Sequence, residues 1–275
     1  MAILSAALEF ASATDPGRVR SHNEDSIGTE PAIGLAVLAD GMGGYNAGEV
    51  ASGIAVAVVS SETKRALDGS ALHAVDPGSG QTEAERIARE HSAKANTSIF
   101  EAARSQPQYS GMGTTLVVAL FFDNRVCVAH VGDSRLYRLR EETFEQVTRD
   151  HSLLQEQIDS GMITREAAKL SQNKNLVTRA LGIDAEVDTE VHVYETKPGD
   201  TYLLCSDGLS DMVGDDDMQL TLTSLQANLQ LAAEQLVQQA NDNGGRDNIS
   251  VILVRVKDDY AAPKGWIARL LSWFK

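Results

Sequence analysis

Val37-Leu38-Ala39-Asp40-Gly41-Met42-Gly43-Gly44 joins an apolar run to a glycine-rich turn. The apolar run, from Ile33 to Ala39, predicts a buried strand that delivers the Asp40 carboxylate into the turn. Because glycine has no Cβ, the backbone of such a turn can bend sharply and approach an ion or a phosphate closely. One Asp and a neighbouring backbone oxygen form a compact site for a hard cation. The same residues also fit an ordinary strand-to-helix turn with Asp40 as the helix cap, so the rest of the chain must decide.

The composition predicts one large domain with an acidic surface. The chain has 275 residues, of which 43% are hydrophobic, and 39 acidic against 24 basic side chains give a net charge of −15 at pH 7. A chain of this length can bury one sizeable core. Its negative charge repels nucleic acid and anionic membranes, which argues against a nucleic-acid partner.

Cysteine usage and the N-terminus predict a cytoplasmic protein. Cys127 and Cys205 each lie inside an apolar run, which is typical of reduced core thiols rather than of a disulfide framework. Residues 1–10 contain Glu9 and lack the basic region of a signal peptide. No apolar run approaches the ~20 residues that a membrane-spanning helix needs.

Hydrophobic periodicity predicts three long helices and a set of antiparallel strands. Apolar residues at helical spacing indicate helices over about 47–66 and 229–240, and Thr82 with Glu85 forms a capping-box pattern for a helix that reaches about Arg104. Asp123-Asn124 is a two-residue hairpin signal, and the short connections between 115 and 147 favour an antiparallel meander over βαβ units. The expected strands span residues 8–14, 33–39, 115–122, 125–131, 135–140, 144–147, 201–206 and 249–256.

Acidic residues recur where the strongest expected strands begin or end. They are Asp25, Asp40, Asp133, Asp207 and Asp247. Each alone fits a turn former, but together they indicate strand ends that converge on one acidic site. Carboxylates held together repel one another, and a pair of divalent cations removes that conflict. Because this set offers oxygen ligands without a Cys/His group, we expect Mg²⁺ or Mn²⁺ rather than structural Zn²⁺.

The polar stretch 14–26 contains the first of these acids. It is too irregular for a core element, and it puts Arg20 shortly before Glu24 and Asp25. One interpretation is a solvated loop with scattered charges. The other is a phosphate-binding guanidinium beside a metal-binding carboxylate, because the planar fork of arginine matches phosphate oxygens.

Six short motifs occur in order along residues 8–257. They are Arg20-Ser21-His22-Asn23-Glu24-Asp25, Ala39-Asp40-Gly41-Met42-Gly43-Gly44, Gly111-Met112-Gly113-Thr114-Thr115, Val131-Gly132-Asp133-Ser134-Arg135, Ser206-Asp207-Gly208-Leu209 and Asp247-Asn248-Ile249-Ser250. Together they resemble the type 2C metal-dependent Ser/Thr protein phosphatases (the PPM family), and its compact bacterial branch in particular. The resemblance implies an α+β fold, in which a central antiparallel β-sandwich is flanked by helices on both faces in four layers, α-β-β-α. It also implies a phosphatase domain over residues 1–258 and a short amphipathic C-terminal tail over 259–275.

The resemblance assigns ligands to a pair of metal ions. By position, Asp40 matches the ligand that bridges the two metals, and the Gly41 carbonyl matches a ligand of one of them. Asp207 and Asp247 match ligands of a single metal, and Asp25 would hold the pair through water. The implied cofactors are two to three Mn²⁺ or Mg²⁺ ions.

The resemblance also assigns roles around this pair. Glu24 would be a supporting acid that acts through metal-bound water, and Asp133 with Asp207 is similar to a third, weaker metal site. Arg20 matches the arginine that binds the substrate phosphate. Arg20 and Asp40 are therefore the residues from which we expect catalysis.

The implied reaction is direct attack of metal-activated hydroxide on phosphoserine or phosphothreonine, without a phosphoenzyme. Neither cysteine is followed at the sixth position by Arg, and the chain has no Asp-x-Asp-x-Thr motif, so the sequence agrees with that route. The implied partners are phosphorylated proteins and a cognate bacterial Ser/Thr kinase that the enzyme opposes. We expect a cytoplasmic monomer.

Met42 departs from the family's pattern, because members from higher organisms carry a His there that is proposed to protonate the leaving alkoxide. Methionine cannot donate a proton. Metal-bound water or another residue, such as His151, would then supply the proton, although a structural role also fits His151. The region from Ser152 to Ser171 corresponds to the flap beside the active site, where we expect substrate selection.

Three other functions fit parts of the sequence. A phosphatase dedicated to one regulatory protein usually carries a sensor or transmembrane domain, which the chain does not display. A catalytically silent phosphoprotein-binding domain of the same fold would have lost metal-binding Asp residues, whereas every matching position holds Asp. An acidic calcium-binding domain remains as the third alternative. Turnover of para-nitrophenyl phosphate with and without Mn²⁺ separates the enzymes from the other two.

The tail residues 264–275 have an amphipathic pattern. They are far fewer than a membrane-spanning helix needs, so this segment is expected to lie on a surface, either of the protein itself or of a partner or membrane. The residues that share one side of a helical wheel are Trp266, Ile267, Leu270, Leu271, Trp273 and Phe274.

Overall fold

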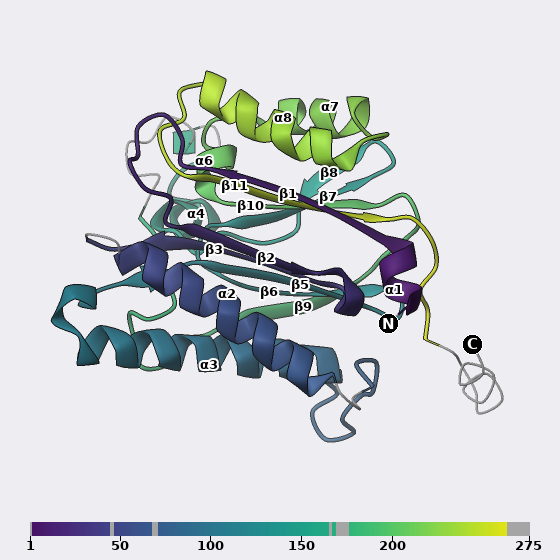
Figure 1. Ribbon diagram of the computed structural model, residues 1–275, viewed down its shortest axis with the longest axis horizontal. Helices are drawn as coiled ribbons and strands as arrows, with labels where there is room; N and C mark the ends of the chain where they lie inside the picture. Colours follow the sequence, from purple (N-terminus) through teal and green to yellow (C-terminus); the bar gives the residue numbers. More distant parts are fainter. Residues whose placement is uncertain (1, 45–46, 68–70, 165–166, 169–175, 263–275) are drawn as a thin grey trace.

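Two antiparallel sheets packed face to face, with helices on both outer faces, form the four layers of the molecule (Figure 1). The computed structural model describes residues 2–44, 47–67, 71–164, 167–168 and 176–262. This arrangement confirms the predicted α+β sandwich of the form α-β-β-α.

The first sheet contains the N-terminal strand and the last strand. Its order is β1 (Leu8–Asp15), β11 (Ile249–Val256), β10 (Thr201–Cys205), β7 (Arg135–Arg140) and β8 (Thr143–Gln146). The second sheet has the order β2 (Asp25–Glu30), β3 (Leu35–Met42), β5 (Leu116–Phe122), β6 (Arg125–Val131) and β9 (Glu190–Glu195), with β4 (Gly113–Thr114) beside the end of β3. Every pairing within these sheets is antiparallel.

Helices cover the outer face of each sheet. The second sheet is covered by α2 (Ala47–Ala66) and α3 (Glu83–Ser105), and the first by α6 (Asp207–Ser210), α7 (Asp215–Ser224) and α8 (Leu229–Asp242). A short α1 (Ala2–Ala7) precedes β1, α4 (Leu153–Asp159) follows β8, and 3₁₀ turns span Pro31–Ile33 and Pro107–Tyr109. The predicted capping box of α3 is present: the Thr82 hydroxyl accepts from the Glu85 amide, and the Glu85 carboxylate accepts from the Thr82 amide at 2.7 Å.

The inner faces of the two sheets share a dry core. Phe121 from the second sheet meets Tyr202 from the first edge-to-face, with ring centroids 5.3 Å apart, and both side chains are buried. Leu38 and Ile252 belong to the same buried cluster. Because each strand alternates its side chains between the inner and outer cores, residues at strand ends are held firmly by both layers.

Three features differ from the expectations. Residues 25–30 form strand β2, although the polar stretch was expected to be irregular; β2 is an edge strand whose side chains are mostly half-buried, so it lacks an apolar pattern. Strand β9, helix α7 and helix α1 carry no strong periodicity and were not expected. The strands between 115 and 147 are not one meander: β5 and β6 pair in the second sheet, and β7 and β8 in the first. The chain changes sheets at Gly132, whose φ of +102° favours glycine.

Strand β3 also runs further than expected. The predicted strand ended at Ala39, but the backbone continues extended through Asp40 to Met42, because Gly41 and Met42 pair with Thr114 and Gly113 of β4. The glycine-rich turn therefore follows Met42, and Asp40 lies within the strand rather than in the turn.

The remaining expectations concern the cysteines, membrane spans and the tail. Cys127 and Cys205 are buried free thiols, as predicted. Among the described residues, no helix combines the length and the apolar character needed to cross a membrane. The predicted amphipathic pattern at 264–275 lies outside the described residues.

Candidate metal centre and phosphate site

Strands β2 and β3 put Asp25 and Asp40 opposite each other, since the two residues are register partners in the second sheet. Asp40 is held by its neighbours from β4 and β5: its amide donates to the Thr115 hydroxyl at 3.0 Å, and its carbonyl accepts from the Thr115 amide and the Thr114 hydroxyl at 2.9 and 2.8 Å. The amide and carbonyl of Asp40 are thus both hydrogen-bonded, and these contacts fix its backbone without using its carboxylate.

The first sheet and the β6–β7 connection deliver the other acids to the same end of the sandwich. Asp207 begins α6 directly after β10, Asp247 lies just before β11, and Asp133 follows β6. A hydrogen bond joins the two sheets there, because the Ser206 hydroxyl donates to Asp25 Oδ2 at 2.8 Å. We call Asp25, Asp40, Asp133, Asp207 and Asp247 the carboxylate cluster.

The carboxylates of this cluster raise one another's pKa. Burial raises the pKa of Asp25 to about 6, with the Asp247 charge adding to the effect. Burial likewise raises the pKa of Asp133 to about 6, with Asp150 and Asp211 adding. The pKa values of Asp40 and Asp207 are raised well above the usual range, first by burial and then by the other carboxylates. A cation close to these groups would therefore stabilise their ionised forms.

The donor set fits hard divalent cations. The described part of the chain gives the buried Asp25 Oδ1 no hydrogen-bond partner, and a buried carboxylate oxygen without one is costly unless a cation or water satisfies it. The cluster supplies only oxygen atoms, which suits Mg²⁺ or Mn²⁺.

Sequence reasoning missed one acid beside the cluster. The Asp211 charge raises the pKa values of both Asp133 and Asp207, so its carboxylate lies near them. Asp211 follows Asp207 by four residues at the end of α6, a spacing that puts both on one side of a helical turn. That spacing was visible in the sequence and could have identified it.

Gly41 and Glu24 lie against the start of α2. A Cβ on Gly41 would come within 2.1 Å of the Gly48 carbonyl oxygen, so only glycine fits between β3 and α2. The Gly41 amide donates to the Glu24 carbonyl at 3.1 Å. Burial raises the pKa of the Glu24 carboxyl. Arg20 opposes this rise, whereas the charges of Asp247 and Glu49 add to it, so the Glu24 carboxyl lies close enough to the cluster for its pKa to be affected by the cluster's charge.

Asn248 is a second residue whose role the sequence did not reveal. Its side-chain oxygen accepts from the Glu24 amide at 2.8 Å, and its side-chain amide donates to the His22 and Pro16 carbonyls at 2.8 and 3.0 Å. One side chain therefore ties the irregular loop before β2 to the start of β11, beside Asp247. The motif contained Asn248, but no sequence signal distinguishes this contact.

Arg20 lies at the rim of the cluster. Its Nη2 donates to Asp247 Oδ2 at 2.7 Å, and about half of the side chain, 51%, is exposed. The hydrogen bond and charge of Asp247 raise the pKa of the guanidinium. An exposed, permanently charged fork beside a carboxylate of the cluster is suited to hold a phosphate dianion.

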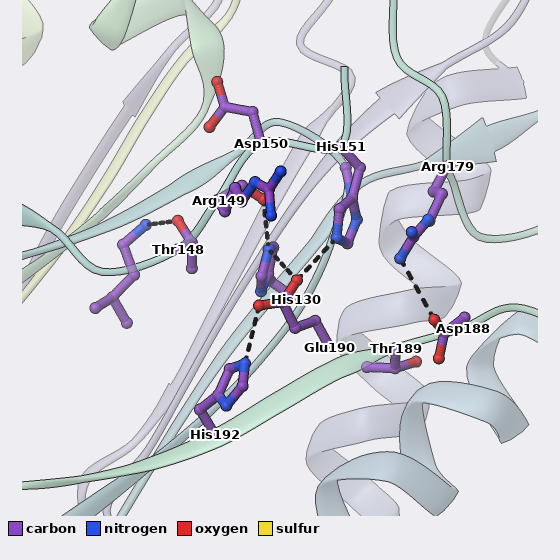
Figure 2. A network of polar contacts seen from close by, with 12 residues as sticks. His130, Thr148, Arg149, Asp150, His151, Arg179, Asp188, Thr189, Glu190 and His192 are labelled. Carbon is purple, nitrogen blue, oxygen red and sulfur yellow. Dashed lines mark hydrogen bonds and ion pairs between the residues drawn. The ribbon is translucent and has the colours of Figure 1, made fainter. Parts of the chain in front are cut away.

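His151 is not available as a general acid. It is buried, its Nδ1 lies 3.2 Å from the Gly132 amide, and its Nε2 lies 3.3 Å from Glu190 Oε2 (Figure 2). Because both ring nitrogens are engaged with protein groups, this histidine has no nitrogen directed toward a substrate. These contacts argue against His151 as the residue that protonates the leaving group.

Comparison with known proteins agrees with this geometry. The family model described as "Protein phosphatase 2C" matches residues 18–248. The serine/threonine phosphatase stp of Listeria welshimeri is 40% identical over 244 residues, which cover 88% of this chain and 93% of that protein. The Mycobacterium tuberculosis serine/threonine phosphatase PstP/Ppp has a crystal structure that is similar with a TM-score of 0.81 at 36% identity, covering 91% of this chain and 99% of the other. The catalytic domain of PstP in complex with two manganese ions is similar with a TM-score of 0.78, at the same identity and coverage.

The raised pKa of Asp133 predicts that replacing it by asparagine changes the thermal stability of the metal-free protein in a pH-dependent way. The Asp133 pKa is about 6 in the fold against ~3.9 for an unfolded Asp. Without divalent ions the native state therefore holds the extra proton, and Asp133 costs stability increasingly as pH rises from about 4 to 6. In chelator, the Tm of Asp133→Asn minus the Tm of the unmodified protein should rise from pH 4.5 to pH 7.5.

Thermal melts in matched buffers check this difference, and the contributions of buried histidines cancel in it. Asp216→Asn serves as the control, because Asp216 is exposed on α7 outside the cluster. A difference that falls with pH would contradict the assignment. Adding Mn²⁺ at pH 7.5 should stabilise the unmodified protein more than Asp133→Asn.

Proposed function

The chain belongs to the protein phosphatase 2C family, and from that premise we propose which of its residues carry the reaction. It is a metal-dependent serine/threonine protein phosphatase, which hydrolyses phosphoserine and phosphothreonine in phosphoproteins. The observation that carries our assignment is that carboxylates from both sheets meet at one end of the sandwich, where the buried Asp25 Oδ1 has no hydrogen-bond partner among the described residues.

We assign the metal ions to the carboxylate cluster and the Gly41 carbonyl. Asp40, Asp207, Asp247 and Gly41 would be ligands of an Mn²⁺ or Mg²⁺ pair, with Asp25 supporting it. When bound, these ions activate water and neutralise charge on the phosphoryl group. Asp133, with Asp207, would hold a third and weaker ion, for which the shared electrostatic effect of the two carboxylates is the support.

Arg20 would bind the substrate phosphate. Its guanidinium is held over the cluster by Asp247, so its position does not depend on substrate. A preorganised arginine loses less entropy when it takes a phosphate than a free one does. Glu24, whose amide is fixed by Asn248, would orient water beside the same ions.

The substrates are phosphorylated proteins, and we propose that a cognate bacterial Ser/Thr kinase phosphorylates them. This enzyme would be a cytoplasmic monomer, a proposal that the two buried free thiols support. The catalytically silent alternative is not favoured, since every carboxylate of the cluster is retained and related phosphatases are named as enzymes.

The phosphatase domain would extend slightly beyond residue 258. Tyr260 is buried, with its hydroxyl 2.6 Å from that of Thr196, and the Ala262 amide donates to Asp123 Oδ1 at 2.7 Å. Asp123 lies in the β5–β6 turn, at the opposite end of β5 from Thr115 and the carboxylate cluster. We therefore propose that the tail after Ala262 contacts a partner or membrane surface away from the active site.

Asp40→Asn and Asp207→Asn should each abolish Mn²⁺-dependent turnover of para-nitrophenyl phosphate. Loss of one ligand removes several kcal/mol of transition-state stabilisation, which corresponds to about a hundredfold or more in rate. Circular dichroism should show an intact fold, because the change removes like-charge repulsion. Asp216→Asn is the matched control, and normal rates in either cluster variant would refute the metal assignment.

Arg20→Ala should mainly raise KM, since the arginine contacts the phosphate before the transition state. A hydrogen bond to a charged group contributes ~1.5–3 kcal/mol, so about a tenfold or larger increase is expected. Steady-state kinetics measures the split between KM and kcat. Arg18→Ala is the control, because Arg18 is an exposed cation of the same loop. A fall in kcat alone would instead give Arg20 a role in the chemical step.

Deletion of Pro263 to Lys275 should leave turnover of para-nitrophenyl phosphate unchanged. The chain at Tyr260 and Ala262 is anchored at the far end of the sandwich from the cluster, and the deletion begins after this anchor. Loss of small-substrate turnover in a folded truncated protein would show that the tail reaches the active site.

A further inference from the structure

His151 holds Gly132 at two points. The His151 amide donates to the Gly132 carbonyl at 2.9 Å, and the Gly132 amide donates to His151 Nδ1 at 3.2 Å. Gly132 immediately precedes Asp133, the carboxylate proposed for the third metal site. Only glycine fits at position 132, because its φ is +102° and a Cβ there would lie 2.7 Å from Thr115. The turn therefore has no side chain of its own to fix it, and it is held by hydrogen bonds to its backbone.

Glu190 on β9 orients the His151 ring. Because Nδ1 accepts the Gly132 amide, it carries the lone pair, and the ring proton belongs on Nε2, which lies 3.3 Å from Glu190 Oε2 (Figure 2). Burial lowers the pKa of His151, with His130 and Arg179 adding and Glu190 opposing, so the ring stays neutral and keeps that lone pair. Burial alone would raise the pKa of Glu190, but its contacts with His192, His130 and His151 lower it overall, which keeps the carboxylate ionised.

The same side chains could be read as a metal site, and the hydrogen bonds argue against it. The candidate ligand atoms of His130, His151 and Glu190 lie within 4.8 Å of one another. However, His130 Nε2 lies 2.8 Å from the Arg149 carbonyl oxygen, so it carries a proton, as does His151 Nε2. A metal-binding histidine directs its other N–H at an acceptor, whereas His151 Nδ1 faces the donor Gly132. Both nitrogens that face Glu190 are donors, not ligands.

The segment that carries His151 is itself fixed from two directions. His130 stacks on the His151 ring, with centroids 4.7 Å apart and planes 17° apart. Arg135 of β7 holds the neighbouring Asp150 with two hydrogen bonds, of 3.0 and 2.7 Å. A rigid acceptor beside Gly132 therefore faces the turn whose next residue is Asp133.

We propose that His151, oriented by Glu190, is a positioning residue that sets the place of the Asp133 carboxylate for the third metal ion. This inference rests on the proposed function, which gives Asp133 its metal. His151 touches neither substrate nor metal; it acts through the Gly132 backbone.

Calorimetric titration of the metal-free protein with Mn²⁺ tests the proposal without reference to activity. The unmodified protein should show a weak binding step that Asp133→Asn removes. His151→Phe keeps a ring that can stack on His130 but leaves the Gly132 amide without its acceptor, and it should weaken this step by about tenfold or more. The tighter steps should be little changed.

Two further variants distinguish positioning from general packing. His151→Asn can put its Oδ1 where Nδ1 lies, so it should restore most of the weak-step affinity. Glu190→Leu removes the acceptor of His151 Nε2 and should weaken the step in the same direction. His192→Gln should not, because His192 contacts Glu190 but is half exposed and does not reach Gly132. If His151→Phe does not fold, the Glu190→Leu and His192→Gln pair still decides the question.

The outcomes separate this proposal from the proposed function. A weak step that depends on Asp133 but is unchanged in His151→Phe, or in Glu190→Leu, overturns only the positioning role. An unmodified protein with no Asp133-dependent step overturns the metal assignment of Asp133 and the positioning role together. Failure of His151→Asn to rescue the weak step would make His151 a packing residue and would also overturn the proposal.

Discussion

Mutual repulsion among clustered carboxylates is the constraint on which the site depends. Asp25, Asp40, Asp133 and Asp207 are all raised in pKa by burial and by neighbouring charge. Such a group of acids would drive strand ends apart unless the sandwich held them, and the shared core between the sheets provides that restraint. Divalent cations bound at the cluster would neutralise this repulsion, which agrees with the metal dependence of the family.

Backbone contacts, rather than the acids themselves, set the geometry of the centre. Gly208 lies so close to β11 that a Cβ there would come within 1.9 Å of the Asn248 carbonyl oxygen, which brings Asp207 beside Asp247. Gly41 makes a similar close approach to α2. Ser206 and Asn248 then join the first sheet to the loop and strand of the second. Small residues and hydrogen-bonding side chains thus set how closely the carboxylates meet.

At Met42 the chain lacks the histidine that family members from higher organisms carry. The structure shows whether His151 could take over its role as a proton donor. His151 cannot replace the missing acid, because Gly132 and Glu190 occupy its two nitrogens. The histidine instead contacts the backbone of Gly132, directly before Asp133, which is the basis of the positioning role that we propose for it.

The sequence by itself determined the long helices α2, α3 and α8, because periodicity and capping are local signals. The sandwich class and the acids of the site followed from the family resemblance that the six motifs carry. The interleaving of the strands between two sheets was decided only by tertiary packing, since β2 and β9 have weak patterns and β6 and β7 differ only in which core they face. The contacts of Asn248 and His151 were likewise hidden, because each joins segments that are apart in the chain. The residue types of the site are visible in short stretches of sequence, whereas the contacts between them depend on the packing of distant segments.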